Sequence, residues 1–292
     1  MGLEFYGHYP QAREIFDQAD AFLGFPLSRL CFEGPEEGLN SDLNAQLAVY
    51  TMSCAITEVL RACGVHPGAV SGYSSGFYAA AFGAGCFDFE AGLLIVRRAG
   101  EIILDEGEKI EGGMAVIFGL SREKVEQLCL GVGEVQVSIA NTPRQIIVSG
   151  LISSVDKVME LAMEQEALDA YVLPVATAYH SRLLSPCTAR LLCEIKANAI
   201  RDPRIPILSY ATLEAVPDGE TLKKVMAHQL SHPVWWVDVV RKLKNGNRLF
   251  LEVGPGAMLS RTVRWIDRHI KMMNTGTVDA FLKAIEHMKR SG

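Results

Sequence analysis

The stretch SGYSSGFYAA, residues 71–80, places Ser74 between Gly72 and Gly76. A short apolar segment, residues 68–71, predicts a strand before the serine, and the alanine-rich segment 75–85 predicts a helix after it. A GxSxG sequence at a strand–turn–helix junction is typical of a nucleophile elbow, whose sharp turn exposes the serine hydroxyl. The backbone N–H of Ser75 and the positive end of the helix could then stabilise an oxyanion. The same small residues could instead simply close a tight turn, so both interpretations stay open.

The segments around this turn predict an α/β fold. Residues 42–63 have apolar positions at helical spacing, with Asp42 as a candidate N-cap, and residues 88–108 predict another helix. A helix–strand–helix order favours a parallel sheet. We therefore expect an α/β-hydrolase-like large domain, formed by residues 1–111 and 177–292.

The segment in between has a different pattern. It predicts, in order, a strand, a capped helix, two strands joined by a turn, a helix and a final strand: 113–120, 121–130, 134–141, 144–150, 153–167 and 170–176. The order βαββαβ is that of a ferredoxin-like unit. We predict that residues 112–176 form a small ferredoxin-like subdomain inserted in the large domain. The large domain then resumes with helix 181–199, strand 205–210, helix 221–246, strand 248–256 and a helix to about 270.

Composition and charge exclude several classes of protein. The chain has 292 residues and a formal net charge of −6, whereas a general nucleic-acid binder needs a basic surface. Its seven cysteines contain no Cys-x-x-Cys pair, which indicates reduced thiols and no metal site. The first residues lack the pattern of a signal peptide, and no apolar run is long enough to span a bilayer. We expect a soluble, cytoplasmic protein without membrane insertion.

A serine nucleophile needs a base, and the histidines are the candidates. His180 follows the apolar segment YVLPVATAY and precedes a helix, at the point where the predicted insert rejoins the large domain. That place favours His180, with His228 and His232 as alternatives. The remaining histidines are His66, in the turn before the elbow, and three that we expect at the surface: His8, His269 and His287.

Several motifs, in order along nearly the whole chain, resemble the malonyl-CoA:acyl carrier protein transacylases and the acyltransferase domains of polyketide synthases. GYSSGFYAA resembles the family's GHSxGEYAA, and NTPRQIIVSG resembles its NSPxQxVISG hairpin. LPVATAYHSRLL is similar to the segment with the catalytic histidine. LSHPVWWVDVV and LEVGPGAMLS are similar to the family's LxxPVxW and EVGPGxxL.

The resemblance implies a ping-pong reaction through an acyl-serine. Ser74 would attack an acyl-CoA thioester with His180 as the base, and the thiol of an acyl carrier protein would then take the acyl group. A backbone carbonyl in the segment of Gln229 would orient the histidine, and the Ser75 amide would donate to the oxyanion. The substrate site would include Gln46, Tyr73, Phe77, Arg98, Ala99 and Asn141. No cofactor is implied, because coenzyme A enters as the carrier of the substrate.

Three departures from the family pattern affect this interpretation. The family begins with a strand and the motif FPGQG, whose glutamine is a second oxyanion donor. This chain resembles the family only from the segment after that motif. A truncated start or a degenerate protein would explain the difference. The family's malonyl-binding arginine lies 25 residues after the serine, at Ala99 here. Arg98 is one residue, or about 100° of helix rotation, away from that direction. Tyr73, Ser75 and Phe77 replace the elbow's histidine, leucine and glutamate. The missing arginine at Ala99 and the apolar side chain of Phe77 make a neutral acyl group plausible beside malonyl.

Two other functions stay open. One is a hydrolase that clears acyl groups from carrier proteins, and the other is a non-catalytic partner that binds a carrier protein or a synthase. Because carrier proteins are acidic, docking would need local basic residues. The candidates are Arg182, Arg190 and Lys196, on the helix after His180.

Overall fold

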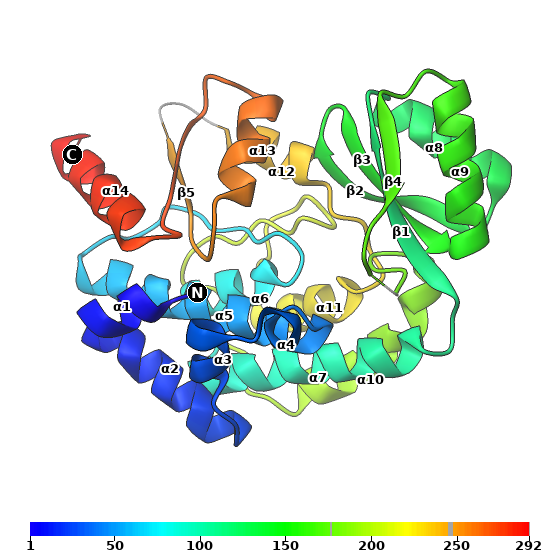
Figure 1. Cartoon of the computed structure of the whole chain (residues 1–292). Helices are drawn as coiled ribbons and strands as arrows, with labels where there is room; N and C mark the ends of the chain where they lie inside the picture. The colour runs from blue at the N-terminus through cyan, green and yellow to red at the C-terminus, as the bar shows by residue number, and fades with distance from the viewer. Residues whose placement is uncertain (176, 245–247, 292) are drawn as a thin grey trace. The chain divides into compact units, whose positions relative to one another are not determined.

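The computed structural model describes residues 1–175, 177–244 and 248–291 (Figure 1). The predicted strand 170–176 and helix 221–246 extend into residues outside these ranges. The chain divides into two compact units. The first consists of Met1–Gly100, Ile200–Ile207 and Lys244–Gly292, and the second of Glu101–Ala199 and Leu208–Leu243. The narrower limits predicted for the small subdomain, residues 112–176, stay a prediction.

The second unit contains a four-stranded antiparallel sheet in the order β2-β3-β1-β4. Its elements are β1 (Gly112–Phe118), α8 (Arg122–Val132), β2 (Val135–Thr142), β3 (Gln145–Leu151), α9 (Ile152–Glu164) and β4 (Asp169–Val172). Figure 1 shows α8 and α9 together beside the strands. The predicted βαββαβ order is therefore confirmed. The central strands β1 and β3 are buried over five consecutive residues, as expected of strands covered on both faces.

The rest of the second unit contains further helices, and one helix predicted as continuous is divided in two. A short turn of 3₁₀-helix, Arg182–Leu184, precedes α10 (Ser185–Lys196), and α11 spans Gly219–His228. The Asp218 carboxylate caps α11 by accepting from Thr221 N at 2.7 Å. The single helix predicted for 221–246 is wrong, because α11 ends at His228 and α12 covers Trp236–Leu243. Pro233 lies between them, and proline inside a helix removes a hydrogen bond and clashes with the preceding turn.

The residues between these two helices, 229–235, form what we call the α11–α12 loop. Its backbone extends the neighbouring sheet edge, since Val234 N donates to Ser138 O at 2.8 Å and Ala140 N donates to Val234 O at 3.0 Å. This leaves other carbonyls of the loop available to accept hydrogen bonds from elsewhere in the unit.

The first unit is mainly helical and includes a short parallel sheet. Its strands are β5 (Leu249–Glu252) and β6 (Lys271–Asn274), which pair in parallel, and a single parallel bridge joins Val70 to Ile207. The helices are α1 (Leu3–His8), α2 (Pro10–Leu23), α3 (Leu27–Glu33), α4 (Glu36–Leu39), α5 (Asp42–Ala62), α6 (Gly76–Gly83), α13 (Met258–Ile266) and α14 (Val278–Ser291). Helix α7 (Phe89–Gly107) begins in this unit and ends in the second.

Helix α5 runs through the core of the first unit. Eleven of its residues are buried, among them Tyr50, whose ring stacks on Phe89 with the centroids 5.6 Å apart. The N-cap is Ser41, so the prediction of Asp42 as the cap is wrong by one residue. Asp42 lies instead in the first turn, where its negative charge interacts favourably with the helix dipole.

A side chain from β5 fixes the start of α13. The buried carboxylate of Glu252 accepts from Leu259 N at 2.9 Å and from Ser260 N at 2.8 Å. These are N–H groups that the first turn of a helix leaves without partners. Within the described residues, none of the helices combines the length and the apolar character that crossing a membrane requires.

Candidate active site

Ser74 lies in a tight turn between the bridge at Val70 and helix α6. Its φ angle is 51°, in the left-handed region that residues with a Cβ rarely adopt. The turn is closed by hydrogen bonds from Gly76 N to Tyr73 O at 2.9 Å and from Phe77 N to Ser74 O at 3.0 Å. Strained backbone at a residue with a hydroxyl side chain supports a functional interpretation of Ser74.

The two glycines that flank Ser74 have different roles. A Cβ at Gly72 would lie 2.3 Å from Phe77 N and 2.4 Å from the carbonyl carbon of Gly76, which no side chain tolerates. A Cβ at Gly76 would meet nothing within 4 Å. Of these two positions, only residue 72 must be glycine, because the backbone of the turn leaves no room there for a Cβ atom.

The residue after the serine presents a donor at the start of α6. Ser75 is the N-cap of this helix, and its side chain makes no capping hydrogen bond. In the described part of the chain, no acceptor is found for the Ser75 N–H. A free N–H beside a helix N-terminus, next to the Ser74 hydroxyl, can stabilise negative charge that develops on a bound carbonyl oxygen.

His180 lies in the second unit and has the same unusual backbone conformation as Ser74. Its φ angle is 59°, and only 5% of the residue is exposed. Its N–H donates to Leu230 O at 3.0 Å, and its carbonyl accepts from Gln136 Nε2 at 3.3 Å. The oxygen of the same Gln136 amide accepts from Arg182 N at 3.2 Å. The backbone on both sides of His180 is therefore held by other segments of the unit.

The imidazole of His180 is fixed in one tautomer by two backbone carbonyls. Its Nδ1 lies 3.0 Å from Gln229 O and 3.0 Å from His232 O, both in the α11–α12 loop. Because a carbonyl can only accept, Nδ1 must carry the proton and Nε2 must be the unprotonated nitrogen of the neutral ring. A neutral imidazole with Nε2 unprotonated is the form that can take a proton from a serine hydroxyl.

Burial also keeps this imidazole neutral. It lowers the pKa of His180 from 6.5 to about 4, against the opposing effect of the hydrogen bonds to Gln229 and His232. The alternative bases are less buried, because His228 is exposed and His232 is half-buried. Partial burial and the neighbouring His232 nevertheless lower the pKa of His228 as well. His8, His66, His269 and His287 are all exposed.

The other predicted site residues are distributed over both units. In the first unit, Gln46 and Tyr73 are half-buried, whereas Phe77 and Ala99 are fully buried. Arg98, next to Ala99 on α7, is exposed. In the second unit, Asn141 on β2 and Gln229 are both buried.

One contributor at this site was not predicted from the sequence. The carbonyl of His232 is the second acceptor for His180 Nδ1, and no side-chain pattern could reveal it, because any residue supplies a backbone carbonyl. Its nearest sequence signal is Pro233, which predicts an interruption of the helix.

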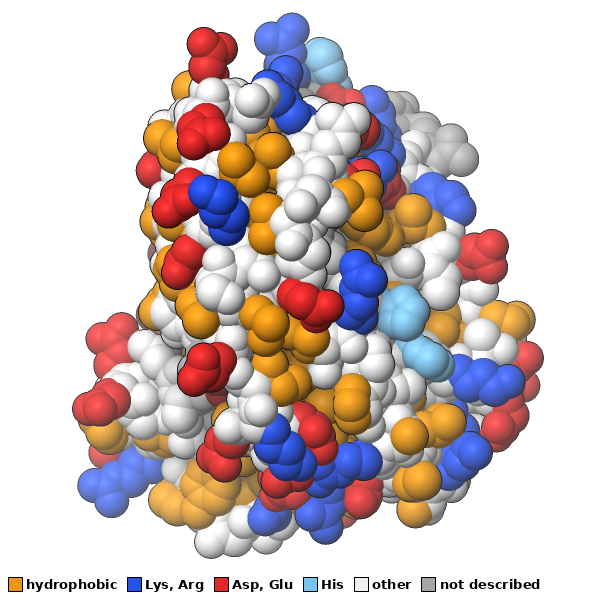
Figure 2. Space-filling view, turned by 90° about the vertical axis from the view of Figure 1, so that its right-hand side faces the viewer, with side chains coloured by type: hydrophobic (Ala, Val, Ile, Leu, Met, Phe, Trp, Pro, Cys, Tyr) orange, Lys and Arg blue, Asp and Glu red, His pale blue; other side chains and the backbone are white. Residues whose placement is uncertain are grey.

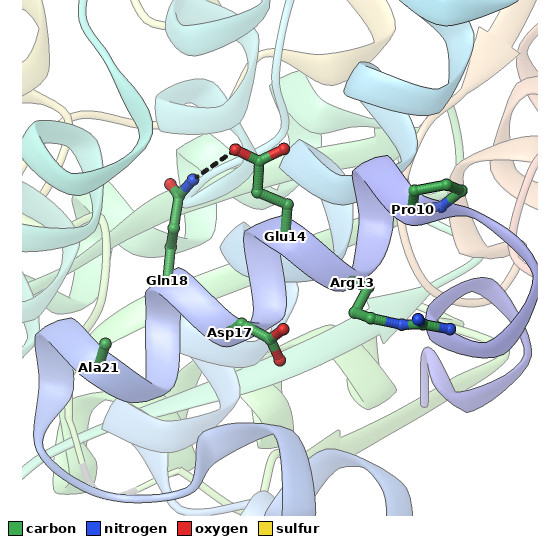
Figure 3. A pocket seen from close by; sticks show the side chains of 6 residues that line it. All are labelled: Pro10, Arg13, Glu14, Asp17, Gln18 and Ala21. Atoms are coloured by element: carbon green, nitrogen blue, oxygen red, sulfur yellow. Dashed lines mark hydrogen bonds between the residues drawn. The ribbon is translucent and has the colours of Figure 1, made fainter.

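Two surface hollows in the first unit are lined by other residues. One, of about 520 Å³, is lined by Pro10, Arg13, Glu14, Asp17, Gln18 and Ala21 of α2 (Figure 3). In this hollow Gln18 Nε2 donates to Glu14 Oε1 at 3.3 Å. A larger one, of about 680 Å³, lies between α2, the ends of α5 and α6, and residues 201–205. Neither hollow is lined by a predicted site residue. Among the described residues, no group of three or more His, Cys, Asp or Glu could hold a metal ion.

The chain is similar to known proteins over almost its whole length. Residues 1–278 match the family model described as the acyl transferase domain. A malonyl CoA-acyl carrier protein transacylase of Bacillus subtilis is 34% identical, with 99% of this chain and 93% of the relative covered. The polyketide biosynthesis malonyl CoA-acyl carrier protein transacylase PksC of the same organism is also 34% identical, over 91% of this chain and 93% of that protein.

Solved structures agree with this similarity. The malonyl CoA-acyl carrier protein transacylase of Coxiella burnetii superimposes with a TM-score of 0.93 at 28% identity, covering 98% of this chain and 92% of that one. A malonyl-transacylase solved in complex with a type II polyketide acyl carrier protein gives a TM-score of 0.94 at 25% identity, covering 98% and 94%. The predicted fold class is confirmed by these structures.

Proposed function

Because the chain belongs to the acyl transferase domain family, we propose that it moves an acyl group from coenzyme A to the phosphopantetheine thiol of an acyl carrier protein. The acyl group would travel through an ester on Ser74. The observation that carries this proposal is the environment of His180, whose Nδ1 faces two carbonyls and whose Nε2 is therefore the basic nitrogen. The left-handed turn at Ser74 supports the same assignment.

In the first half-reaction, Ser74 Oγ forms a bond to the thioester carbonyl carbon while its proton passes to Nε2 of His180. The Ser75 N–H stabilises the oxyanion, the carbon–sulfur bond breaks, and the leaving thiolate takes the proton back from the imidazolium. In the second half-reaction, the carrier thiol gives its proton to Nε2 and attacks the ester. The ester's bond to Ser74 Oγ then breaks, and Oγ recovers the proton.

The reaction exchanges only protons and an acyl group, so we propose no cofactor. We place it in the cytoplasm, which suits seven cysteines that are all free thiols.

The identity of the acyl group depends on Ala99. Malonyl is the group named for the relatives, and its carboxylate is best held by a bidentate arginine. Ala99 is fully buried and the neighbouring Arg98 is exposed, which supports the proposal that Arg98 does not take the place of the family's arginine. The lack of an arginine at this position makes a neutral acyl group the second candidate for the transferred group, after malonyl.

Mass spectrometry of the intact protein after incubation with malonyl-CoA or, separately, acetyl-CoA tests the proposal. We expect one acyl adduct in the wild-type protein, none in Ser74→Ala, and a strongly slowed adduct in His180→Ala. His228→Ala is the matched control, because it removes an exposed histidine of the same unit and should load normally. Failure to load either group would contradict the acyl-serine, and normal loading of His180→Ala would exclude it as the base.

Adding an acyl carrier protein to the loaded enzyme separates transfer from hydrolysis. A transferase gives acylated carrier protein, whereas a hydrolase gives the free acid at a rate that does not depend on the carrier.

A further inference from the structure

We propose that Tyr210 is a positioning residue for His180, because it holds both ends of the α11–α12 loop whose carbonyls orient the imidazole. The inference rests on the function proposed above, in which His180 is the base. Tyr210 is 1% exposed and lies in the second unit with His180 and the loop.

The hydroxyl of Tyr210 reaches the first residue of the loop. It donates to Gln229 O at 3.4 Å and to Gln229 Oε1 at 3.3 Å. Gln229 O is the carbonyl that also accepts from His180 Nδ1. The phenol therefore restrains the same oxygen atom that sets the direction of the imidazole.

The backbone of Tyr210 reaches the last residue of the loop. Its carbonyl accepts from Trp235 N at 3.3 Å, just before α12 begins. The segment that carries Tyr210 is itself held by the bridge between Leu208 and Ala215 and by a hydrogen bond from Ser209 N to Glu214 O at 2.9 Å. One residue on a restrained segment thus contacts Gln229 and Trp235, and His232, which supplies the second carbonyl, lies between them in the chain.

The ring of Tyr210 also packs on the imidazole directly. The two rings meet edge to face, with centroids 6.1 Å apart and planes at 85°. This arrangement is a favourable one for aromatic rings and limits rotation of the imidazole. Tyr210 therefore restrains His180 both through the ring and through its hydrogen-bond acceptor.

The side chain of Gln229 indicates how much the loop depends on this tyrosine. Gln229 is buried, and its Nε2 has no hydrogen-bond partner among the described residues. Its Oε1 accepts from Tyr210. Loss of the hydroxyl would leave a buried amide without that partner next to the carbonyl that orients His180.

The test compares two tyrosine-to-phenylalanine variants of the full chain. Tyr210→Phe keeps the ring and removes the hydroxyl. Tyr50→Phe is the matched control, because the Tyr50 hydroxyl is also buried and donates to a backbone carbonyl, Phe89 O, at 3.2 Å. Each variant removes one buried hydroxyl donor, which Tyr210 shares between Gln229 O and Oε1 and Tyr50 gives to Phe89 O, so both should lose a similar amount of thermal stability.

Two readouts separate positioning from general stability. NMR of histidine-labelled protein measures solvent exchange of the His180 Nδ1 proton, assigned by its absence in His180→Ala. Steady-state transfer measures kcat and KM for the acyl-CoA. We expect Tyr210→Phe to speed Nδ1 proton exchange about fivefold and to lower kcat about fivefold, with KM unchanged, as the loss of one buried hydrogen bond implies. Tyr50→Phe should change neither.

Unchanged proton exchange and kcat in Tyr210→Phe would overturn the proposal, and so would equal changes in Tyr50→Phe. Faster exchange in Tyr210→Phe, in a protein that loads no acyl group, would support the positioning role and refute the proposed function.

Discussion

Ser74 and His180 both have positive φ angles, of 51° and 59°, although neither is a glycine. Such a conformation costs about 1–3 kcal/mol and persists only where surrounding contacts enforce it. For His180 those contacts are Leu230, Gln136 and the two loop carbonyls. Glu134, Glu166 and Leu213 also have positive φ, so strain alone does not identify a site. The chemistry of the hydroxyl and the imidazole distinguishes Ser74 and His180 from them.

The buried imidazole predicts an unusual pH dependence of acyl loading. Because burial lowers the pKa of His180 to about 4, the base form persists below the ordinary value of 6.5. The rate of loading, measured by rapid-quench mass spectrometry, should therefore fall only as pH approaches 4. An acidic limb near pH 6.5 would show that the base is another group or that water reaches the ring.

The same pKa shift affects folding stability with a definite sign. In the unfolded chain the ring takes a proton below about pH 6.5, and in the folded protein only near 4. Between these values the unfolded state binds more protons, so the stability contributed by neutral His180 is complete above pH 6.5 and is lost as the pH falls towards 4. In His180→Asn this part of the pH dependence of the unfolding free energy should disappear.

At the scale of elements, the turn before α6 and the α11–α12 loop determine where the two candidate groups lie. The turn depends on local packing, because Gly72 closes against residues four and five positions ahead of it. The loop depends on distant partners, because Gln229 is 49 residues from His180. Packing within the turn can be predicted from neighbouring residues in the sequence, whereas the hydrogen bond between the loop and His180 cannot.

The turn predicts opposite outcomes for its two glycines. In Gly72→Ala the new Cβ would overlap the backbone of Phe77 and Gly76, so the turn must move. We expect the unfolding free energy to fall by more than about 2 kcal/mol. Gly76→Ala adds a methyl group in open space at the first residue of α6, where alanine is the better helix former, and should be neutral or stabilising by up to about 1 kcal/mol. Denaturant titration of both variants checks this. Equal losses would mean that the close approach at Gly72 does not exist in solution.

For the molecule as a whole, charge bears most directly on the proposed partner. The chain has a net charge of −6, and Figure 2 shows acidic and basic side chains interspersed over one face. An acidic carrier protein would then need a local group of basic residues. Arg190 is engaged by Asp105 and Glu106, and Arg182 by Gln136. Lys196, exposed at the end of α10, has no ion pair within the described ranges.

We therefore predict that Lys196→Glu raises KM for the carrier protein several-fold at low salt and leaves acyl-CoA loading unchanged. The effect should shrink as the ionic strength rises, because salt screens exposed charges. Lys157→Glu is the matched control, since this exposed lysine lies on α9 and already pairs with Glu160 at 2.8 Å. An identical KM in Lys196→Glu and wild type would place the docking surface elsewhere.

The sequence by itself determined the elements whose causes are local. The βαββαβ order could be predicted because the apolar strand segments, the Ser121 cap of α8 and the turn residues around Pro143 act over a few residues. The helix–turn at Ser74 could be predicted for the same reason, and its family motifs pointed to His180 and to Gln229.

Tertiary structure alone decided how those residues are held. The second carbonyl at His232, 52 residues from His180, and the contact of Tyr210 with both ends of the loop join segments far apart in the sequence. The same is true of the lowered pKa of His180, because burial is a property of the packed unit and not of its neighbours in the chain. Backbone carbonyls and desolvation leave no side-chain pattern, so only the folded chain could reveal them.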